Sequence, residues 1–151
     1  MVDNDIYYHS MIKGKTLIDQ RDNNIKNFAV IFDIDDTIIK IVTSFKKIEY
    51  YRIESIHHLY KYALENNIFV IFITAREADK NNMKQTKKQL KELGISQYDL
   101  LYFRPKWMNN VAEYKLFARK NVTETGYQPL FSIGDCDWDV GEYGGEPILI
   151  Q

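Results

Sequence analysis

The chain has few of the residues on which several common kinds of site depend. It contains one cysteine and three histidines among its 151 residues. The single cysteine, Cys136, excludes an internal disulfide, and together with His9, His57 and His58 it shows no zinc-ligand spacing. These shortages argue against redox chemistry and against a zinc site.

The chain also lacks a long hydrophobic run and an excess of either charge. Its longest apolar run, residues 68–73, is far shorter than the roughly 18 residues of a membrane span. Residues 1–15 lack the continuous apolar stretch of a secretory signal. The formal net charge is -1, so no general field draws the chain to nucleic acid or to an anionic membrane. We therefore expect a cytoplasmic protein with no membrane partner, for which nucleic acid could serve only as a substrate.

The length and the hydrophobic content of 45% are sufficient for one core. We expect a single domain over residues 1–151, without repeats or linkers. Residues 1–26 carry no strong periodicity and form an N-terminal extension in this prediction, in which residues 9–19 are compatible with a short helix. No pattern in the chain indicates an oligomeric state.

Apolar runs and helical spacing alternate along the rest of the chain. Residues 28–32 and 68–73 are continuously apolar, which is typical of parallel strands buried on both faces. Weaker runs cover 100–103, 129–133 and 147–150, and helical spacing covers 48–65, 79–93 and 111–125. Such alternation predicts an α/β fold with a doubly wound parallel sheet and helices on both faces.

Polar side chains occupy the positions that follow the predicted strands, at the edge where ligands bind in sheets of this kind. Carboxylates follow the first and fourth runs, a threonine follows the second, and a lysine lies in the helix after the third. These residues are Asp33, Asp35, Asp135, Asp137, Asp139, Thr74 and Lys115.

Carboxylates gathered at one edge would repel one another unless a cation lay between them. Oxygen ligands without a suitable histidine or cysteine favour a hard ion, and Mg²⁺ commonly binds one or two carboxylates together with a substrate phosphate. The hydroxyl of Thr74 and the charge of Lys115 suit the phosphate itself. The sequence therefore predicts a magnesium and phosphate site.

The first two aspartates of this group are placed for phosphoryl transfer. Asp33 can attack phosphorus and form an aspartyl phosphate, which splits one difficult displacement into two easier ones. Asp35, two residues further on, can protonate the leaving alcohol and then activate water. Charge on the transferring oxygens would be stabilised by the metal, Lys115, Thr74 and backbone amides of residues 34–36.

Four motifs in this order resemble those of the haloacid dehalogenase (HAD) superfamily. They are FDIDDT at 32–37, FITAR at 72–76, Lys115 within AEYKLFARK, and SIGDCDWD at 132–139. LLYFRP and the segment from EYK to GEYGG look most like the branch of acid phosphatases and plant vegetative storage proteins, subfamily IIIB. The resemblance runs from about residue 28 to the C-terminus.

The resemblance implies a HAD-like Rossmannoid fold and a Mg²⁺-dependent phosphomonoesterase acting on a phosphorylated small molecule or macromolecule. It further implies that Asp33 and Asp135 bind Mg²⁺ by carboxylate and Asp35 by its carbonyl. Thr74 and Lys115 would bind phosphate, and Asp139 would orient Lys115 or a metal-bound water. Asp36 departs from the pattern, because glycine or glutamate is usual there.

Other functions share parts of this pattern. A receiver-type signalling domain needs its phosphorylated aspartate after the third strand, where this chain has Phe103, Arg104 and Pro105. A catalytically retired binding or storage protein would not need the complete set of site residues. Phosphotransfer to an acceptor other than water uses the same residues and stays open.

The surroundings of the site are predicted to be open. The segments between the motifs are accounted for by core strands and helices, so only residues 38–47 are free to form a small flap and no cap domain is expected. Near the rim lie Arg76, Arg104, Lys106 and Trp107, each of which also fits an ordinary surface position. Cys136 is expected to be structural, because neighbouring carboxylates raise the pKa of its thiol.

Overall fold

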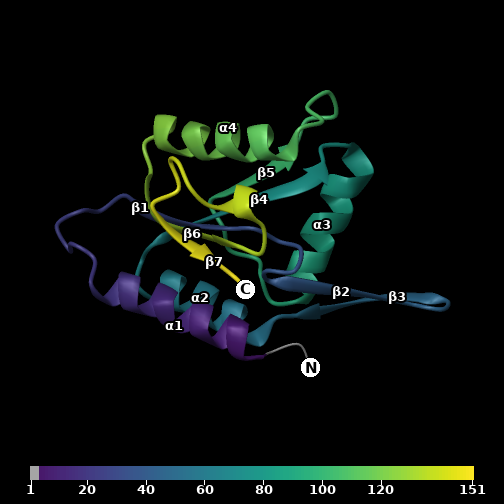
Figure 1. The fold of residues 1–151 in the computed structure, drawn as a ribbon, viewed down its shortest axis with the longest axis horizontal. Helices are drawn as coiled ribbons and strands as arrows, with labels where there is room; N and C mark the ends of the chain where they lie inside the picture. Colours follow the sequence, from purple (N-terminus) through teal and green to yellow (C-terminus); the bar gives the residue numbers. More distant parts are fainter. Residues whose placement is uncertain (1–3) are drawn as a thin grey trace.

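The computed structural model describes residues 4–151 of the chain. A central sheet of five parallel strands has the order β5-β4-β1-β6-β7. Its members are β1 (Phe28–Phe32), β4 (Phe69–Glu77), β5 (Leu100–Arg104), β6 (Gln128–Gly134) and β7 (Glu146–Leu149). Figure 1 shows this sheet between layers of helices.

Register places the end of β1 beside the end of β6 and the middle of β4. Phe32, the last residue of β1, is opposite Phe72 of β4 and Ile133 of β6. All five residues of β1 are buried, as continuous apolarity predicted. The segments that leave β1 and β6 therefore start close together, next to Ile73 and Thr74 of β4, at one edge of the sheet.

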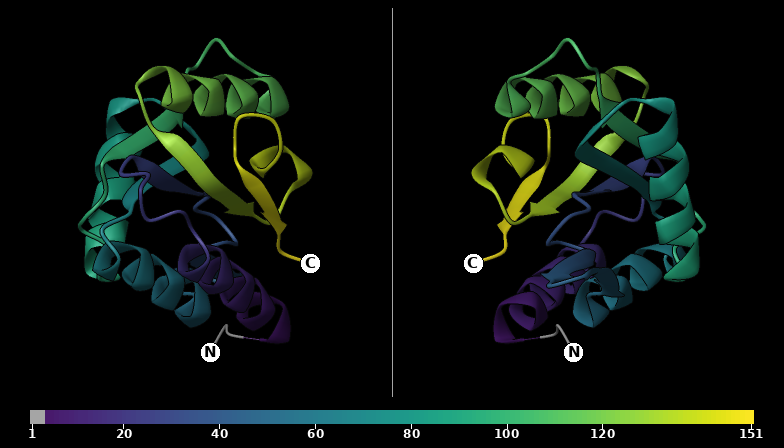
Figure 2. Two further views of the ribbon diagram at one scale, coloured as in Figure 1. Left: turned by 90° about the vertical axis from the view of Figure 1, so that its left-hand side faces the viewer. Right: turned by 90° about the vertical axis from the view of Figure 1, so that its right-hand side faces the viewer.

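Helices cover both faces of the sheet (Figure 2). The larger hydrophobic cluster joins one face of the sheet to α1 (Asp5–Asp19), α2 (Glu54–Glu65) and the inner side of α3 (Lys80–Glu92). The smaller cluster joins the other face to α4 (Val111–Glu124). The predicted doubly wound α/β sheet is confirmed. The N-terminal extension contains a full helix, which begins earlier than residue 9.

The prediction of a helix from residue 48 is wrong over residues 48–53. Residues 47–52 form β3 (Lys47–Arg52), which pairs antiparallel with β2 (Ile39–Ser44), and α2 begins only at Glu54. β-Branched and aromatic residues favour this pairing, which sets Ile41 opposite Tyr50. The Tyr50 hydroxyl donates to Glu92 of α3, so tertiary contact also favours the strand. The β2–β3 hairpin projects from the molecule in Figure 1.

Within residues 4–151 the hairpin is the only sheet besides the central one, and no further folded unit lies outside the core layers, so the expected small flap without a cap domain is confirmed, although the flap extends to Arg52. Within the same residues, no helix combines the length and the apolar character needed to cross a membrane.

Candidate active site

Alternation along β1 directs Asp33 toward α4. Ala29 and Ile31 of β1 belong to the cluster that packs under α4, and Asp33 continues this alternation just beyond the strand. One carboxylate oxygen, Oδ1, accepts from Lys115 Nζ at 2.8 Å, and Oδ2 accepts from the Thr37 hydroxyl at 3.1 Å. The side chain is only 10% exposed. Asp33 is therefore held in one orientation.

Lys115 reaches the same point from the first half of α4. Asn110 caps this helix by accepting from the Glu113 amide at 3.0 Å, which fixes where the helix begins. Lys115 Nζ lies 2.6 Å from Asp139 Oδ1 and donates to the Ile73 carbonyl at 2.8 Å. Burial alone would lower the pKa of Lys115, but the two carboxylates outweigh burial and raise it. The amine is thus held as a cation at the centre of the site.

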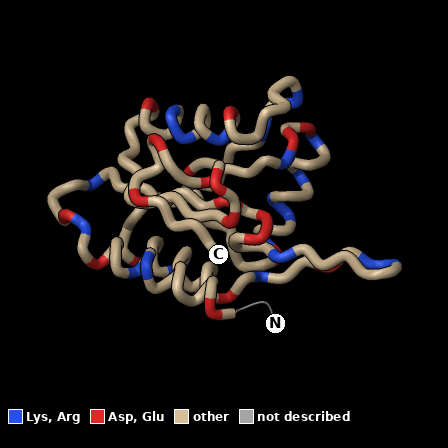
Figure 3. Tube along the Cα trace, in the orientation of Figure 1, with Lys and Arg blue, Asp and Glu red and all other residues tan. Residues whose placement is uncertain are grey.

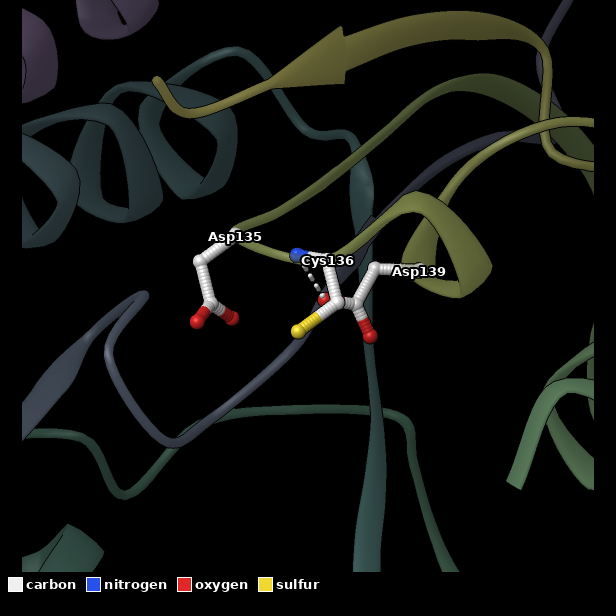
Figure 4. A group of neighbouring side chains, drawn as sticks. All are labelled: Asp135, Cys136 and Asp139. Carbon is white, nitrogen blue, oxygen red and sulfur yellow. Dashed lines mark hydrogen bonds between the residues drawn. The ribbon is translucent and has the colours of Figure 1, made fainter. Parts of the chain in front are cut away.

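The loop after β6 brings in the remaining aspartates. Asp139 turns back so that its Oδ2 accepts from the Cys136 amide at 3.0 Å, while the Asp135 side chain extends away from this hydrogen bond (Figure 4). A Cβ on Gly134 would lie 2.3 Å from the Asp139 Cβ, so only glycine permits this approach. Arg119 of α4 fixes the loop by donating to the Trp138 carbonyl at 2.6 Å.

Burial, together with neighbouring carboxylates, shifts the pKa values of the aspartates at this site. Burial raises the pKa of Asp33 to about 8, with Asp139 and Asp135 adding to the effect and Lys115 opposing it. Burial also raises the pKa of Asp135, whose carboxyl is within hydrogen-bonding reach of Asp33. One lysine does not offset this concentration of negative charge, so the site as it stands favours a second cation.

The donor chemistry identifies which residues suit a metal ion. Asp135, Cys136 and Asp139 have ligand atoms within 4.8 Å of one another, but a thiol is a poor ligand for a hard ion. The oxygens of the neighbouring Asp33 and Asp135 carboxylates suit Mg²⁺ better than a thiol does. The predicted carbonyl ligand belongs to Asp35, two residues after Asp33.

Asp35 is held by an arginine, Arg76, whose contact with it the sequence analysis did not predict. Arg76 donates to both carboxylate oxygens of Asp35, from Nη2 at 2.7 Å and from Nε at 3.0 Å. Its other nitrogen, Nη1, donates to Thr86 at 2.9 Å and Gln89 at 2.7 Å on α3. This bidentate pair joins the predicted acid and base to a helix. The position of Arg76, two residues after Thr74, was the one feature of the sequence that could have indicated a role at the site.

Thr74 lies within β4 rather than after the end of its strand. The pairing between β4 and β5 is irregular after Ile73, and the buried Thr74 hydroxyl accepts from the Arg76 amide at 3.1 Å. Lys115 contacts the carbonyl of the preceding residue, Ile73. Thr74 is therefore close in the chain to the group with which it is predicted to bind phosphate.

Asp36 occupies a turn that explains why glycine is usual at this position. Its φ is 60°, a conformation that aspartate tolerates better than most side chains. Its carboxylate pairs with Lys40 Nζ at 2.9 Å, and its carbonyl accepts from the Tyr7 hydroxyl at 3.1 Å. These contacts join the turn to the hairpin and to α1.

The other residues that the sequence singled out have varied surroundings. Arg104 donates to the Ala75 and Met108 carbonyls and is a structural group rather than a rim contact. Lys106 and Trp107 are exposed, and Asp137 lies exposed on the loop after β6. Burial, with Asp135 and Asp139 adding to it, raises the pKa of the Cys136 thiol to about 11, as expected for a structural cysteine. Arg119 was missed because its partners, Trp138 and Glu142, come close only in the fold. Thr37 was given no role, although its partner Asp33 is only four residues away in the same motif.

A doubly wound sheet with a lysine, a threonine and an acidic cluster at its carboxyl edge defines an α/β protein built for an anionic ligand. The model of the HAD superfamily, subfamily IIIB (Acid phosphatase), matches residues 43–148, and the chain belongs to this family. It is a phosphatase that hydrolyses phosphorylated substrates. No curated protein matches the chain. The family match begins after residues 32–37, so the roles of Asp33 and Asp35 rest on the geometry of the first motif.

Proposed function

We propose that the chain is a Mg²⁺-dependent phosphomonoesterase that forms an aspartyl phosphate on Asp33. The observation that carries this proposal is the buried contact of Asp33 with Lys115, itself oriented by Asp139. This arrangement fixes the orientation of the Asp33 carboxylate and places the positive charge of Lys115 beside it. It supplies both the nucleophile and a partner for the phosphate oxygens.

In the first half of the reaction, a carboxylate oxygen of Asp33 attacks phosphorus and the ester P–O bond breaks. The departing oxygen takes a proton from Asp35, so the alcohol leaves neutral. Lys115 and Thr74 bind the phosphoryl oxygens. Because Arg76 engages both oxygens of Asp35 in this structure, one of these hydrogen bonds must open when the proton moves.

In the second half, water attacks the phosphorus of the aspartyl phosphate. Asp35 takes the proton from that water, the bond between phosphorus and the Asp33 oxygen breaks, and inorganic phosphate leaves. Asp33 is regenerated as a carboxylate and Asp35 as an acid, so the cycle closes without a further reactant. A Mg²⁺ ion held by Asp33, Asp135 and the Asp35 carbonyl would neutralise charge on the phosphoryl oxygens.

The first test is the substitution Asp33→Asn, because an amide can neither form the acyl phosphate nor balance the metal charge. We expect hydrolysis of 4-nitrophenyl phosphate to require Mg²⁺ and to be abolished by Asp33→Asn. Asp137→Asn, which removes an exposed carboxylate from the same edge, is the matched control and should retain activity. Undiminished activity in a chelator, or in Asp33→Asn, would overturn the proposal. A retired storage protein would show no activity in any variant.

Phosphotransfer is a second candidate, because the Asp35 side chain is 42% exposed and an acceptor alcohol can approach it. The aspartyl phosphate would then pass its phosphoryl group to the alcohol instead of water. Adding glycerol and comparing released phosphate with released nitrophenol distinguishes the two outcomes. Location in the cytoplasm stays a prediction from the sequence.

A further inference from the structure

The positive charge of the chain is concentrated in two neighbouring segments. The hairpin (residues 39–52) and α3 (residues 80–92) together carry nine lysines and arginines but only two glutamates, in a chain of net charge -1. The contributors on α3 are all exposed and form a surface that we call the lysine track: Lys80, Lys84, Lys87, Lys88 and Lys91. Figure 3 shows the basic positions along α3 and at the hairpin tip.

Exposed aromatic rings accompany this charge. Phe45 at the hairpin tip is 95% exposed and has Lys46 Nζ 5.7 Å from its ring centre. Tyr51 of β3 is also exposed, and Trp107, in the loop after β5, is 78% exposed. Rings left open to solvent beside lysines offer stacking surfaces next to positive charge.

The lysine track and the hairpin are both joined to the active site. The inner side of α3 binds Arg76 through Thr86 and Gln89, and Arg76 holds Asp35. At the base of the hairpin, Lys40 pairs with Asp36. The hairpin and α3 also touch each other, because Arg52 donates to the Leu93 carbonyl at 3.1 Å. The lysine track therefore lies beside the hairpin, where Lys40, Lys47 and Arg52 are paired with carboxylates. Both segments adjoin the residues proposed to act on phosphate.

We propose that the lysine track and the neighbouring hairpin bind single-stranded nucleic acid and present its terminal phosphomonoester to Asp33. The inference rests on the proposed phosphatase function and names its substrate class. The lysines of α3 follow an axis of about 20 Å, long enough to meet several phosphates of one strand. Bases stack on the exposed rings without regard to sequence, while the site without a cap domain admits the end of a polymer.

Two other macromolecules are less well matched to these features. An acidic phosphopeptide would meet the lysines, but it brings no regular series of flat rings to stack on Phe45, Tyr51 and Trp107. A membrane could bind the hairpin tip. The lysine track, however, lies on α3, whose inner side contacts Arg76 of the active site. Both remain outcomes of the experiment.

Binding is measured first, by fluorescence anisotropy of a labelled oligothymidylate of about eight nucleotides that carries no terminal monoester. We expect affinity to fall with salt, and the variant Lys84→Glu/Lys87→Glu to bind about tenfold more weakly or worse, with the salt slope reduced by about 1.4. The matched control is Lys26→Glu/Lys120→Glu, which reverses two exposed charges near the opposite edge of the sheet and should bind like the original chain.

Turnover is measured second, on a 5′-phosphorylated oligothymidylate, thymidine 5′-monophosphate and 4-nitrophenyl phosphate. At low salt we expect kcat/KM to be about tenfold higher for the oligonucleotide than for the mononucleotide, a difference that high salt removes. Lys84→Glu/Lys87→Glu and Phe45→Ala should lower only the oligonucleotide value. The same comparison on a 3′-phosphorylated strand shows which end is used.

The two proposals fail in different ways. Absence of any turnover, including that of 4-nitrophenyl phosphate, would contradict the phosphatase mechanism but leave the anisotropy result intact. Equal kcat/KM on oligonucleotide and mononucleotide, with no effect of Lys84→Glu/Lys87→Glu on binding, would overturn the inference while the phosphatase function stands. Preferred turnover of an acidic phosphopeptide, or binding to phosphatidylserine vesicles without binding to the oligonucleotide, would also overturn it.

Discussion

Asp35 and Arg76 are the pair of residues on which proton transfer depends in this proposal. Asp35→Asn keeps the backbone carbonyl proposed as a metal ligand, so substrate affinity should survive while turnover falls by roughly 10²–10⁴-fold. The loss should be smaller for 4-nitrophenyl phosphate, which needs little protonation to depart, than for an alkyl phosphate. A burst of about one nitrophenol per site is expected if the aspartyl phosphate accumulates. Equal losses on the two esters without a burst would assign the acid to another residue.

Arg76 acts through Asp35, so it is a positioning residue. Arg76→Ala leaves Asp35 without its bidentate partner and leaves Thr86 and Gln89 without a donor. We expect turnover of an alkyl phosphate to fall about tenfold or more, and that of 4-nitrophenyl phosphate to fall less, as in Asp35→Asn. Arg76→Lys keeps the positive charge but not the two guanidinium nitrogens that donate to Asp35, so it should recover part of the lost turnover. An equal fall in turnover of both esters, in proportion to a loss of folding stability, would contradict this role.

At the scale of elements, two glycines mark close contacts with different consequences. Gly134 ends β6 against Asp139, and a Cβ there would lie 2.3 Å from the Asp139 Cβ. Gly14 of α1 packs against Leu59 of α2, whose Cδ2 would lie 2.6 Å from an added Cβ. Each Gly→Ala change should lower the free energy of unfolding by about 1–3 kcal/mol through overpacking.

Only Gly134→Ala should also remove activity, because displacing Asp139 frees Lys115 from its contact at 2.6 Å. Gly14→Ala is the control: it strains the packing of two helices remote from Asp33 and should keep its kcat once folded. Denaturant titrations of both variants, together with kcat on 4-nitrophenyl phosphate, separate the two effects. Equal kcat values would show that the β6 loop does not position Lys115.

At the scale of the whole molecule, the acidic edge of the sheet links metal binding to stability. A cation that binds the folded chain relieves repulsion among carboxylates that the fold has brought together. At a Mg²⁺ concentration of 100 times Kd, the gain is about 2.7 kcal/mol, or roughly 5–10 °C in Tm. Asp135→Asn should remove most of this shift, whereas Asp137→Asn, with its side chain exposed, should keep it. An equal Tm in Mg²⁺ and in chelator would argue against the site.

The sequence by itself determined the sheet and the order of its functional groups. Continuous apolarity in residues 28–32 and 68–73 requires burial on both faces, and parallel strands must then present Asp33 and Asp135 at one edge. These signals are local, because each depends on residues adjacent in the chain. The order of the four motifs likewise needs no tertiary information, and the matched family covers the last three of them.

Only the tertiary structure decided how these groups are held. Residues 48–52 have a helical spacing that the pairing of Ile41 with Tyr50 and the contact with Glu92 override. Arg76 resembled a rim residue until the fold set it 2.7 Å from Asp35, 41 positions earlier in the chain. The hairpin and α3 likewise lie in contact, although α2 and β4 separate them in the sequence. Such contacts depend on distances between segments far apart in sequence, and these distances are fixed only when the core packs.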